Sequence, residues 1–144
     1  MLRIKEIMTN NVAYVSPETN LVEVAQLMQK HNVGAMPVME GGNVVGMVTD
    51  RDIVVRNVAH QKDPASTPVS AVMSSQVESV TPNMELNKAA ELMSNKQVRR
   101  LPVIEGNKLV GIVSLGDLAT QAKYDVELGK TLTEVSVPSR PLKM

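Results

Sequence analysis

Apolar positions along this chain form two kinds of pattern, helical spacing and short β-prone runs, and the two kinds alternate. Spacing at i, i+3, i+4 and i+7 predicts two amphipathic helices with an apolar stripe. The stripe positions are Leu21, Val24, Ala25 and Met28 in the first helix and Leu86, Ala89, Ala90 and Met93 in the second. Asn20, with Glu23 three residues later, predicts a capping box at the start of the first helix. The second helix has no such start signal.

Short β-prone runs predict strands before and after each of these helices. The runs before the helices are 12–15 and 77–80, each followed closely by a proline. After each helix, two runs flank a pair of turn residues that supply the positive φ of a tight hairpin. These hairpins are 36–39 with 44–48 around Gly41-Gly42, and 101–104 with 109–113 around Gly106-Asn107. Each hairpin leads into a predicted helix that begins near Thr49 or Ser114.

The order of elements repeats because the chain is an internal duplication. An offset of 65 aligns Pro17 with Pro82 and Asp52 with Asp117 without a gap, and about a third of the paired positions are identical. The two copies run from residue 4 to 56 and from 69 to 121. We expect an α+β fold of two βαββα repeats packed sheet to sheet with pseudo-twofold symmetry, because one such sheet alone leaves a face uncovered. The expected division is 1–60 repeat 1, 61–68 linker, 69–121 repeat 2, and 122–144 a C-terminal helix (around residues 123–133) and tail.

Composition narrows the function. The 144 residues are 43% hydrophobic, with fifteen basic and fifteen acidic side chains and no cysteine. The charges cancel, and two tyrosines are the whole aromatic content, so we expect no nucleic-acid partner. Neither a signal peptide nor an apolar run of membrane-spanning length is present, so we expect a cytoplasmic protein without a membrane partner.

Catalytic patterns are missing from the sequence. The chain has no HxH, HExxH, GxSxG or GxxxxGK[ST] pattern, and its two histidines, His31 and His60, stand at a predicted helix end and in the polar stretch 57–68 between the two copies. We therefore expect no enzyme activity, no metal site and no required cofactor.

Several paired motifs resemble those of a tandem cystathionine β-synthase (CBS) domain pair, also called a Bateman module. They are Ile4-Lys5-Glu6-Ile7-Met8 and its copy at 69–73, the strands at 36–38 and 101–103, and the segments 46–52 and 111–117. The resemblance covers the chain to about Gln121. The chain looks like a stand-alone pair, similar to bacterial hypoxic-response and general-stress CBS proteins.

The resemblance implies a regulatory module that binds AMP, ADP, ATP or another adenosyl compound in clefts between its repeats and signals to a protein partner. By position, it assigns Asp52 and Asp117 as ribose acceptors and Thr49 and Ser114 as hydroxyls facing ribose or phosphate. Physical chemistry supports these roles, because a helix start presents backbone N–H groups suited to phosphate. The same residues also match a capping box that requires no ligand, and the two interpretations are compatible.

The copies differ most just before the proline-containing strands. Arg99-Arg100 in the second copy replace Gly34-Ala35 in the first. Guanidinium suits phosphate oxygens, so Arg100 is a candidate phosphate ligand, the alternative being a solvated pair. Arg51 is either a phosphate contact or part of a surface salt bridge. The small Gly34 leaves room for an adenine ring. The expected pocket lining is Val12, Val77, Gly34, Met36 and Leu101.

Two hypotheses of different class follow. In the first, the chain senses an adenosyl ligand at two unequal sites. In the second, it is a ligand-independent dimerisation or docking scaffold whose Thr/Ser-x-x-Asp motifs only cap helices. Both include a homodimer, which the resemblance implies.

Overall fold

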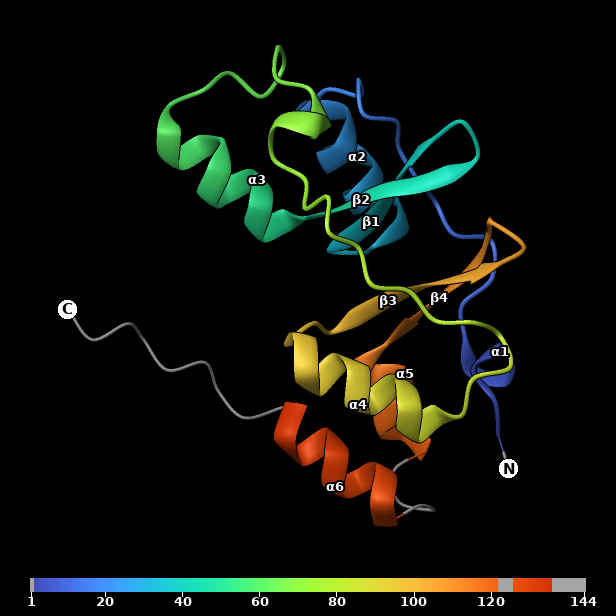
Figure 1. Cartoon of the computed structure of the whole chain (residues 1–144). Coiled ribbons are helices and arrows are strands. Elements are labelled where there is room, and N and C mark those ends of the chain that lie inside the picture. The colour runs from blue at the N-terminus through green and yellow to red at the C-terminus, as the bar shows by residue number, and fades with distance from the viewer. Residues whose placement is uncertain (1, 122–125, 136–144) are drawn as a thin grey trace, which may run out of the picture. The chain divides into compact units, whose positions relative to one another are not determined.

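The computed structural model describes residues 2–121 and 126–135 (Figure 1). It contains α-helices, short 3₁₀ helices and two antiparallel two-stranded sheets, β1-β2 and β3-β4, so the α+β prediction is confirmed. The elements of the first half are α1 (Ile4–Ile7), α2 (Leu21–His31), β1 (Ala35–Glu40), β2 (Asn43–Thr49), α3 (Asp50–Arg56) and η1 (Val58–His60). Those of the second half are η2 (Val69–Ala71), α4 (Leu86–Lys96), β3 (Arg100–Glu105), β4 (Lys108–Ser114), α5 (Leu115–Gln121) and α6 (Val126–Val135).

Both hairpins turn at the predicted residue pairs. Gly41 and Gly42 have φ angles of +59° and +82°, and Gly106 and Asn107 have +56° and +67°. Two consecutive positive φ values give the turn whose twist matches a right-handed hairpin. At the start of α2 the Asn20 side chain accepts the Glu23 N–H at 2.9 Å, which confirms that cap. At the start of α4, Glu85 makes no side-chain cap bond.

The predicted first strands, 12–15 and 77–80, were wrong in extent. Each shrinks to one parallel bridge, Val15 with Val38 and Val80 with Val103. Val15 donates its N–H to the Pro37 carbonyl at 3.1 Å, and the next bond of a parallel ladder requires an N–H from Pro37 itself. Proline has none, and Pro17 ends the ladder on the other side for the same reason. Pro102 and Pro82 have the same effect in the second copy.

Packing groups the chain differently from the sequence repeats. Unit 1 comprises Met1–Asn10, Val80–Val103 and Gly111–Met144, and unit 2 comprises Asn11–Ser79 and Ile104–Val110. The first residues of each repeat, 4–10 and 69–79, therefore pack with the body of the other repeat, and we call them the exchanged segments. The repeat division predicted from the sequence describes the duplication, whereas these units describe where the cores form.

Equivalent hydrogen bonds hold the exchanged segments in both units. In unit 1, Lys5 donates its N–H to Pro82 O at 2.9 Å, and Thr9 pairs with Ile112 of β4. In unit 2, Ser70 donates to Pro17 O at 3.0 Å, and Ser74 pairs with Met47 of β2. Ser70 and Ser74 lie 65 residues after Lys5 and Thr9, so each unit reproduces the exchange of the other.

Each unit has its own apolar core. In unit 2 it is built from the α2 stripe, β1, β2 and the exchanged segment, and its buried residues are Val15, Leu21, Val24, Met28, Met36, Val38, Val48, Val69 and Val72. The predicted α4 stripe in unit 1 is fully buried. The prediction for α2 was wrong at Ala25, which is exposed although its counterpart Ala90 is buried.

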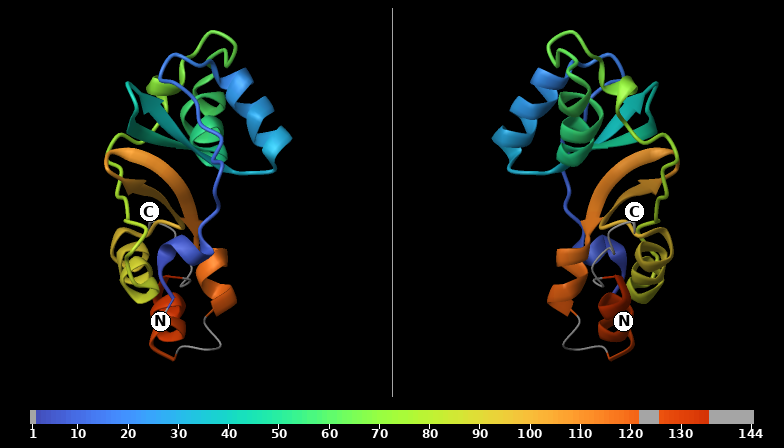
Figure 2. Two further views of the ribbon diagram at one scale, coloured as in Figure 1. Left: turned by 90° about the vertical axis from the view of Figure 1, so that its right-hand side faces the viewer. Right: turned by 90° about the vertical axis from the view of Figure 1, so that its left-hand side faces the viewer.

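Helix α6 explains the difference between Ala25 and Ala90. It packs on α4 and α5, as both views in Figure 2 show, and it buries Leu128, Leu132 and Val135. Its bounds confirm a C-terminal helix, while residue 123, where the sequence placed its start, lies outside the described residues. Unit 2 contains no such covering helix among the residues described.

Candidate functional site

The turn from β2 into α3 forms a complete capping box. Thr49 Oγ1 accepts the Asp52 N–H at 3.1 Å, and Asp52 Oδ2 accepts the Thr49 N–H at 2.9 Å. The turn from β4 into α5 repeats it: Ser114 Oγ accepts the Asp117 N–H at 3.1 Å, and Asp117 Oδ2 accepts the Ser114 N–H at 2.8 Å. The capping role is therefore real at both turns, and it occupies one oxygen of each carboxylate.

A backbone hydrogen bond joins each turn to the segment that differs most between the copies. Asp50 donates its N–H to Gly34 O at 2.9 Å in unit 2, and Leu115 donates to Arg99 O at 2.8 Å in unit 1. The structure thus brings Gly34 to the Thr49 turn and Arg99 to the Ser114 turn, residues that lie about fifteen positions apart in the sequence.

The expectation of free backbone N–H groups at these helix starts was wrong for α3. Besides the three N–H groups of Thr49, Asp50 and Asp52, the Arg51 N–H donates to Asp50 Oδ1 at 2.8 Å. Leucine stands at the Asp50 position in the second copy and provides no acceptor. Within the described chain, the Gly116 N–H of α5 therefore has no protein acceptor.

The second oxygens of the two carboxylates also differ. Asp52 Oδ1 lies 3.9 Å from the Nε of Arg56, whose Nη1 donates to Val72 O at 3.1 Å. Gln121 stands at the Arg56 position in the second copy, so no guanidinium is available there. Asp117 Oδ1 has no hydrogen bond or ion pair to any residue that the structure describes, and it remains available as an acceptor.

The local charge differs between the two turns. The first turn combines Arg51 and Arg56 with Asp50 and Asp52, a formal charge of 0, whereas the second combines Arg99 and Arg100 with Asp117, a formal charge of +1. Arg51, Arg99 and Arg100 are exposed. None of them forms an ion pair with a described residue, so the surface salt bridge considered for Arg51 is not present in this part of the chain.

The expected pocket lining is only partly accessible. Met36 and Leu101 are each 1% exposed, so neither residue presents surface to a ligand in this structure. A Cβ on Gly34 would lie 3.0 Å from Asp50 Oδ2, so this carboxylate takes up space that the sequence assigned to an adenine ring. Val12 and Val77 are half-buried, and both belong to unit 2.

Two residues that shape the first turn, Asp50 and Arg56, were not among the predicted site residues. Asp50 accepts the Arg51 N–H, so this donor is not available to a ligand, and Asp50 also adds a negative charge. Arg56 forms an ion pair with the outer oxygen of Asp52. Both residues had a signal in the sequence, because Asp50 aligns with Leu115 in the repeat and Arg56 follows Asp52 at i+4.

Two features are absent from the described residues, a metal-binding cluster and a membrane-spanning helix. No group of three or more His, Asp or Glu side chains comes together in a way that could hold a metal ion. No helix in the described ranges is long and apolar enough to cross a membrane.

Comparison with known proteins matches both halves of the chain. The CBS domain family model matches residues 4–57 and 69–123. The chain is 49% identical over 136 residues to the CBS domain-containing protein YhcV of Bacillus subtilis, covering 94% of this chain and 96% of YhcV. It is 34% identical over 120 residues to hypoxic response protein 1 of Mycobacterium tuberculosis, covering 83% of this chain and 84% of that protein.

The fold agrees with a solved CBS structure as well. The CBS domain pair of protein MJ0100, solved in complex with 5′-methylthioadenosine and S-adenosyl-L-methionine, superposes with a TM-score of 0.78 at 22% identity, covering 86% of this chain and 98% of that one. The duplication, the two hairpin sheets and the sequence matches over both repeats lead to one conclusion: this chain belongs to the CBS domain family and contains a pair of CBS domains.

Proposed function

We propose that this chain is a regulatory module that binds an adenosyl ligand with a phosphate group at the turn from β4 into α5, and passes the ligand state to a protein partner. The observation that supports this choice is the set of unsatisfied groups at that turn. Asp117 Oδ1, the Gly116 N–H and the side chains of Arg99 and Arg100 have no partner among the residues described, and the local formal charge is +1.

Each group has a role that suits its chemistry. The outer oxygen of Asp117 accepts a ribose hydroxyl, while its inner oxygen keeps the helix capped. The Ser114 hydroxyl accepts the Asp117 N–H and still has its own proton to donate. Arg99 and Arg100 pair with phosphate oxygens, for which guanidinium has a matching planar geometry.

The first turn is the weaker site in this proposal. Asp52 Oδ1 is paired with Arg56, the four N–H groups at the start of α3 are already donated, and Asp50 adds a negative charge beside Gly34. A phosphate placed there finds the N–H groups and Arg56 already engaged, so it is held less strongly than at the second turn. We expect this turn to be empty or to take a ligand without phosphate.

The scaffold function remains the second candidate, and one observation favours it. Both capping boxes are complete without a ligand, so the Thr/Ser-x-x-Asp motifs have a sufficient structural reason to exist. A scaffold, however, gives no physical reason for two unpaired arginines beside Asp117. The two functions differ in whether any small molecule stabilises the protein.

A thermal-shift panel of AMP, ADP, ATP, Mg-ATP, NADH and S-adenosylmethionine tests the proposal. A ligand present at about a hundred times its Kd stabilises the folded state by about 2.7 kcal/mol. We expect at least one phosphorylated ligand to raise Tm, and Arg100→Ala to reduce its affinity roughly tenfold to a hundredfold, as for a lost charge-assisted hydrogen bond. Arg51→Ala, the matched control, should keep the affinity. If no ligand raises Tm at millimolar concentration, the scaffold function stands instead.

A further inference from the structure

Two methionines, Met8 and Met73, occupy equivalent positions in the two exchanged segments, 65 residues apart. Both are half-buried, and the sulfur of each lies against a buried glycine of the neighbouring strand. A Cβ on Gly111 of β4 would be 2.6 Å from Met8 Sδ, and a Cβ on Gly46 of β2 would be 2.6 Å from Met73 Sδ. Each thioether therefore fills the space that a side chain on the strand would otherwise occupy.

Each of these methionines is followed directly by the residue that joins its segment to the strand. Thr9 and Ile112 exchange backbone hydrogen bonds of 2.8 and 3.0 Å, and Ser74 and Met47 exchange two of 2.9 Å. Both pairs are isolated bridges rather than parts of a longer ladder. At this point of the strand, the segment is therefore held by one bridge and by the sulfur contact beside it, which is a weak attachment.

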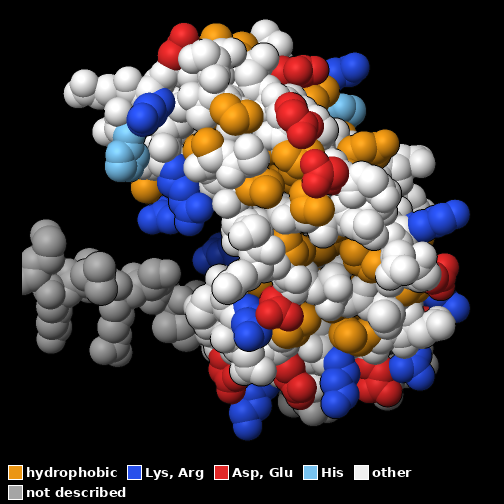
Figure 3. Space-filling model, turned by 45° about the horizontal axis from the view of Figure 1, so that its top comes forward, with side chains coloured by type: hydrophobic (Ala, Val, Ile, Leu, Met, Phe, Trp, Pro, Cys, Tyr) orange, Lys and Arg blue, Asp and Glu red, His pale blue; other side chains and the backbone are white. Residues whose placement is uncertain are grey.

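Methionine is the residue through which this chain can react with a mild oxidant, because the sequence contains ten methionines and no cysteine. Apolar side chains, a class that includes methionine, reach the surface in several places in Figure 3. The duplication repeats two methionine pairs, Met8 with Met73 and Met28 with Met93. Met28 and Met93 are 7% and 0% exposed, so an oxidant reaches the first pair more readily than the second.

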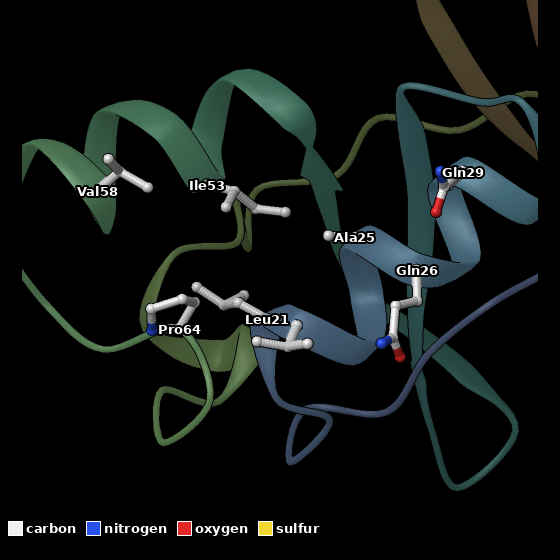
Figure 4. A pocket seen from close by; sticks show the side chains of 8 residues that line it. Leu21, Ala25, Gln26, Gln29, Ile53, Val58 and Pro64 are labelled. Carbon is white, nitrogen blue, oxygen red and sulfur yellow. The ribbon is translucent and has the colours of Figure 1, made fainter.

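The other methionines in the described part of the chain lack this combination of access and symmetry. Three of them are half-buried: Met39, Met47 and Met84. Their equivalent positions in the other repeat hold isoleucine or threonine. No methionine is among the described residues that line the groove between α2 and α3 (Figure 4), so this opening gives an oxidant no direct contact with sulfur.

We propose that Met8 and Met73 are paired oxidation sites, at which a peroxide forms the sulfoxide and releases the exchanged segment from its strand. The sulfur lone pair attacks one oxygen of hydrogen peroxide, and the O–O bond breaks. The attacked oxygen stays on sulfur and passes its proton to the leaving hydroxide, which departs as water. Sulfur loses two electrons and the peroxide gains them.

The added oxygen has no place at the contact with glycine. On the strand side, a sulfoxide oxygen on Met8 would overlap the backbone at Gly111, where even a Cβ is too close to the sulfur. If the side chain turns outward, the polar sulfoxide reaches water, but the contact that holds the segment is lost. Either arrangement loosens the bridge beside it.

Both strands continue into the turns that carry the capping boxes. Gly46 precedes Thr49 by three residues, and Gly111 precedes Ser114 by three. Release of a segment therefore loosens the strand that leads into the turn. The oxidation and the release themselves do not require the ligand proposed above.

Hydrogen peroxide treatment of the full chain, followed by peptide mass spectrometry, tests the two sites. We expect Met8 and Met73 to gain one oxygen each at least about tenfold faster than Met28 and Met93, because reactivity follows exposure. Hydrogen exchange of the backbone amides at the two bridges should become at least about tenfold faster after oxidation. Tm should fall by at least about 3 °C.

Leucine has nearly the volume of methionine and forms no sulfoxide, so leucine variants should fold. In Met8→Leu, oxidation should speed amide exchange at the Ser74 bridge and leave the Thr9 bridge protected, and Met73→Leu should show the reverse. Met39→Leu combined with Met84→Leu is the matched control and should respond to peroxide as the native protein does. Methionine sulfoxide reductases should restore the Tm of the oxidised native protein.

Three results would overturn the proposal. One is complete oxidation of Met8 and Met73 without faster amide exchange at the bridges. Another is oxidation of this pair no faster than that of Met28 and Met93. The third is a response to peroxide at the Thr9 bridge that is the same in Met8→Leu as in the native protein.

Discussion

Replacing Gly111 by alanine tests how tightly the exchanged N-terminal segment packs in unit 1. A Cβ at this position would lie 2.6 Å from Met8 Sδ and 2.9 Å from Thr9 O. The methionine side chain is flexible and can move, but the carbonyl cannot move freely. Thr9 and Ile112 exchange two backbone hydrogen bonds, of 2.8 and 3.0 Å, and any retreat of the segment stretches them.

The expected cost is that of overpacking, about 1 to 3 kcal/mol. Alanine also reduces the entropy of the unfolded chain, which offsets about 0.4 to 1 kcal/mol, so the middle of each range gives a net loss of about 1.3 kcal/mol. For a chain of this size that corresponds to a Tm decrease of roughly 3 to 5 °C. Gly46→Ala should behave alike in unit 2, because its Cβ would lie 2.6 Å from Met73 Sδ and 2.9 Å from Ser74 O.

Urea unfolding followed by circular dichroism measures the effect, with Gly116→Ala as the matched control. The nearest heavy atom to a Cβ on Gly116 is 3.6 Å away, and the residue lies in α5, where alanine is favoured by up to about 1 kcal/mol. Combining Gly111→Ala with Met8→Ala removes the sulfur contact and leaves the carbonyl contact. If Gly111→Ala is as stable as the native protein, the segment is not packed against β4 as described.

Three further substitutions test other parts of the fold by the same unfolding measurement. Leu128→Ala removes a side chain that is 0% exposed and should cost about 2 to 5 kcal/mol; a loss below about 1 kcal/mol would show that α6 does not cover unit 1. Asn107→Val places a β-branched residue at a φ of +67° and should cost about 1 to 2 kcal/mol, with Asn107→Gly near neutral; equal stability of the two would contradict the turn. Arg3→Ala breaks an ion pair with Glu85 at 3.4 Å that is 40% and 44% exposed, so it should cost under about 1 kcal/mol, and a larger loss would reveal a role beyond that pair.

Local signals in the sequence predicted the parts of the fold that depend on local backbone chemistry. Gly41-Gly42 specified a hairpin because few other residues adopt two positive φ values in succession. Asn20 marked the start of α2 because its side chain satisfies an N–H that no helix carbonyl reaches. The internal repeat then predicted that both halves share these elements, and they do.

Features that depend on distant contacts were not predictable from the same signals. Nothing near Lys5 or Thr9 indicates that they bond to Pro82 and Ile112 rather than to their own repeat. The exposure of Ala25 depends on α6, which covers only the other repeat.

For the candidate site, too, the residues were predictable from the sequence, whereas their hydrogen-bond partners were not. Asp117, Ser114 and the arginines were predicted from the sequence, because residue type and repeat position specify them. The sequence does not predict whether a given oxygen or N–H group already has a hydrogen-bond partner, because this depends on the folded geometry. The capping boxes and the Asp50 contact with the Arg51 N–H became visible only in three dimensions.

Isothermal titration calorimetry tests the central proposal most directly. The phosphorylated adenosyl ligand that raises Tm is titrated into the native protein, into Asp117→Ala and into Asp52→Ala. Both variants lose a capping box, so without ligand both should lose a similar stability of about 0.5 to 2 kcal/mol. We expect one molecule bound per native chain, affinity reduced at least about tenfold in Asp117→Ala, and affinity nearly unchanged in Asp52→Ala. No binding to the native protein, or an equal loss of affinity in both variants, would contradict a ligand site at the turn from β4 into α5.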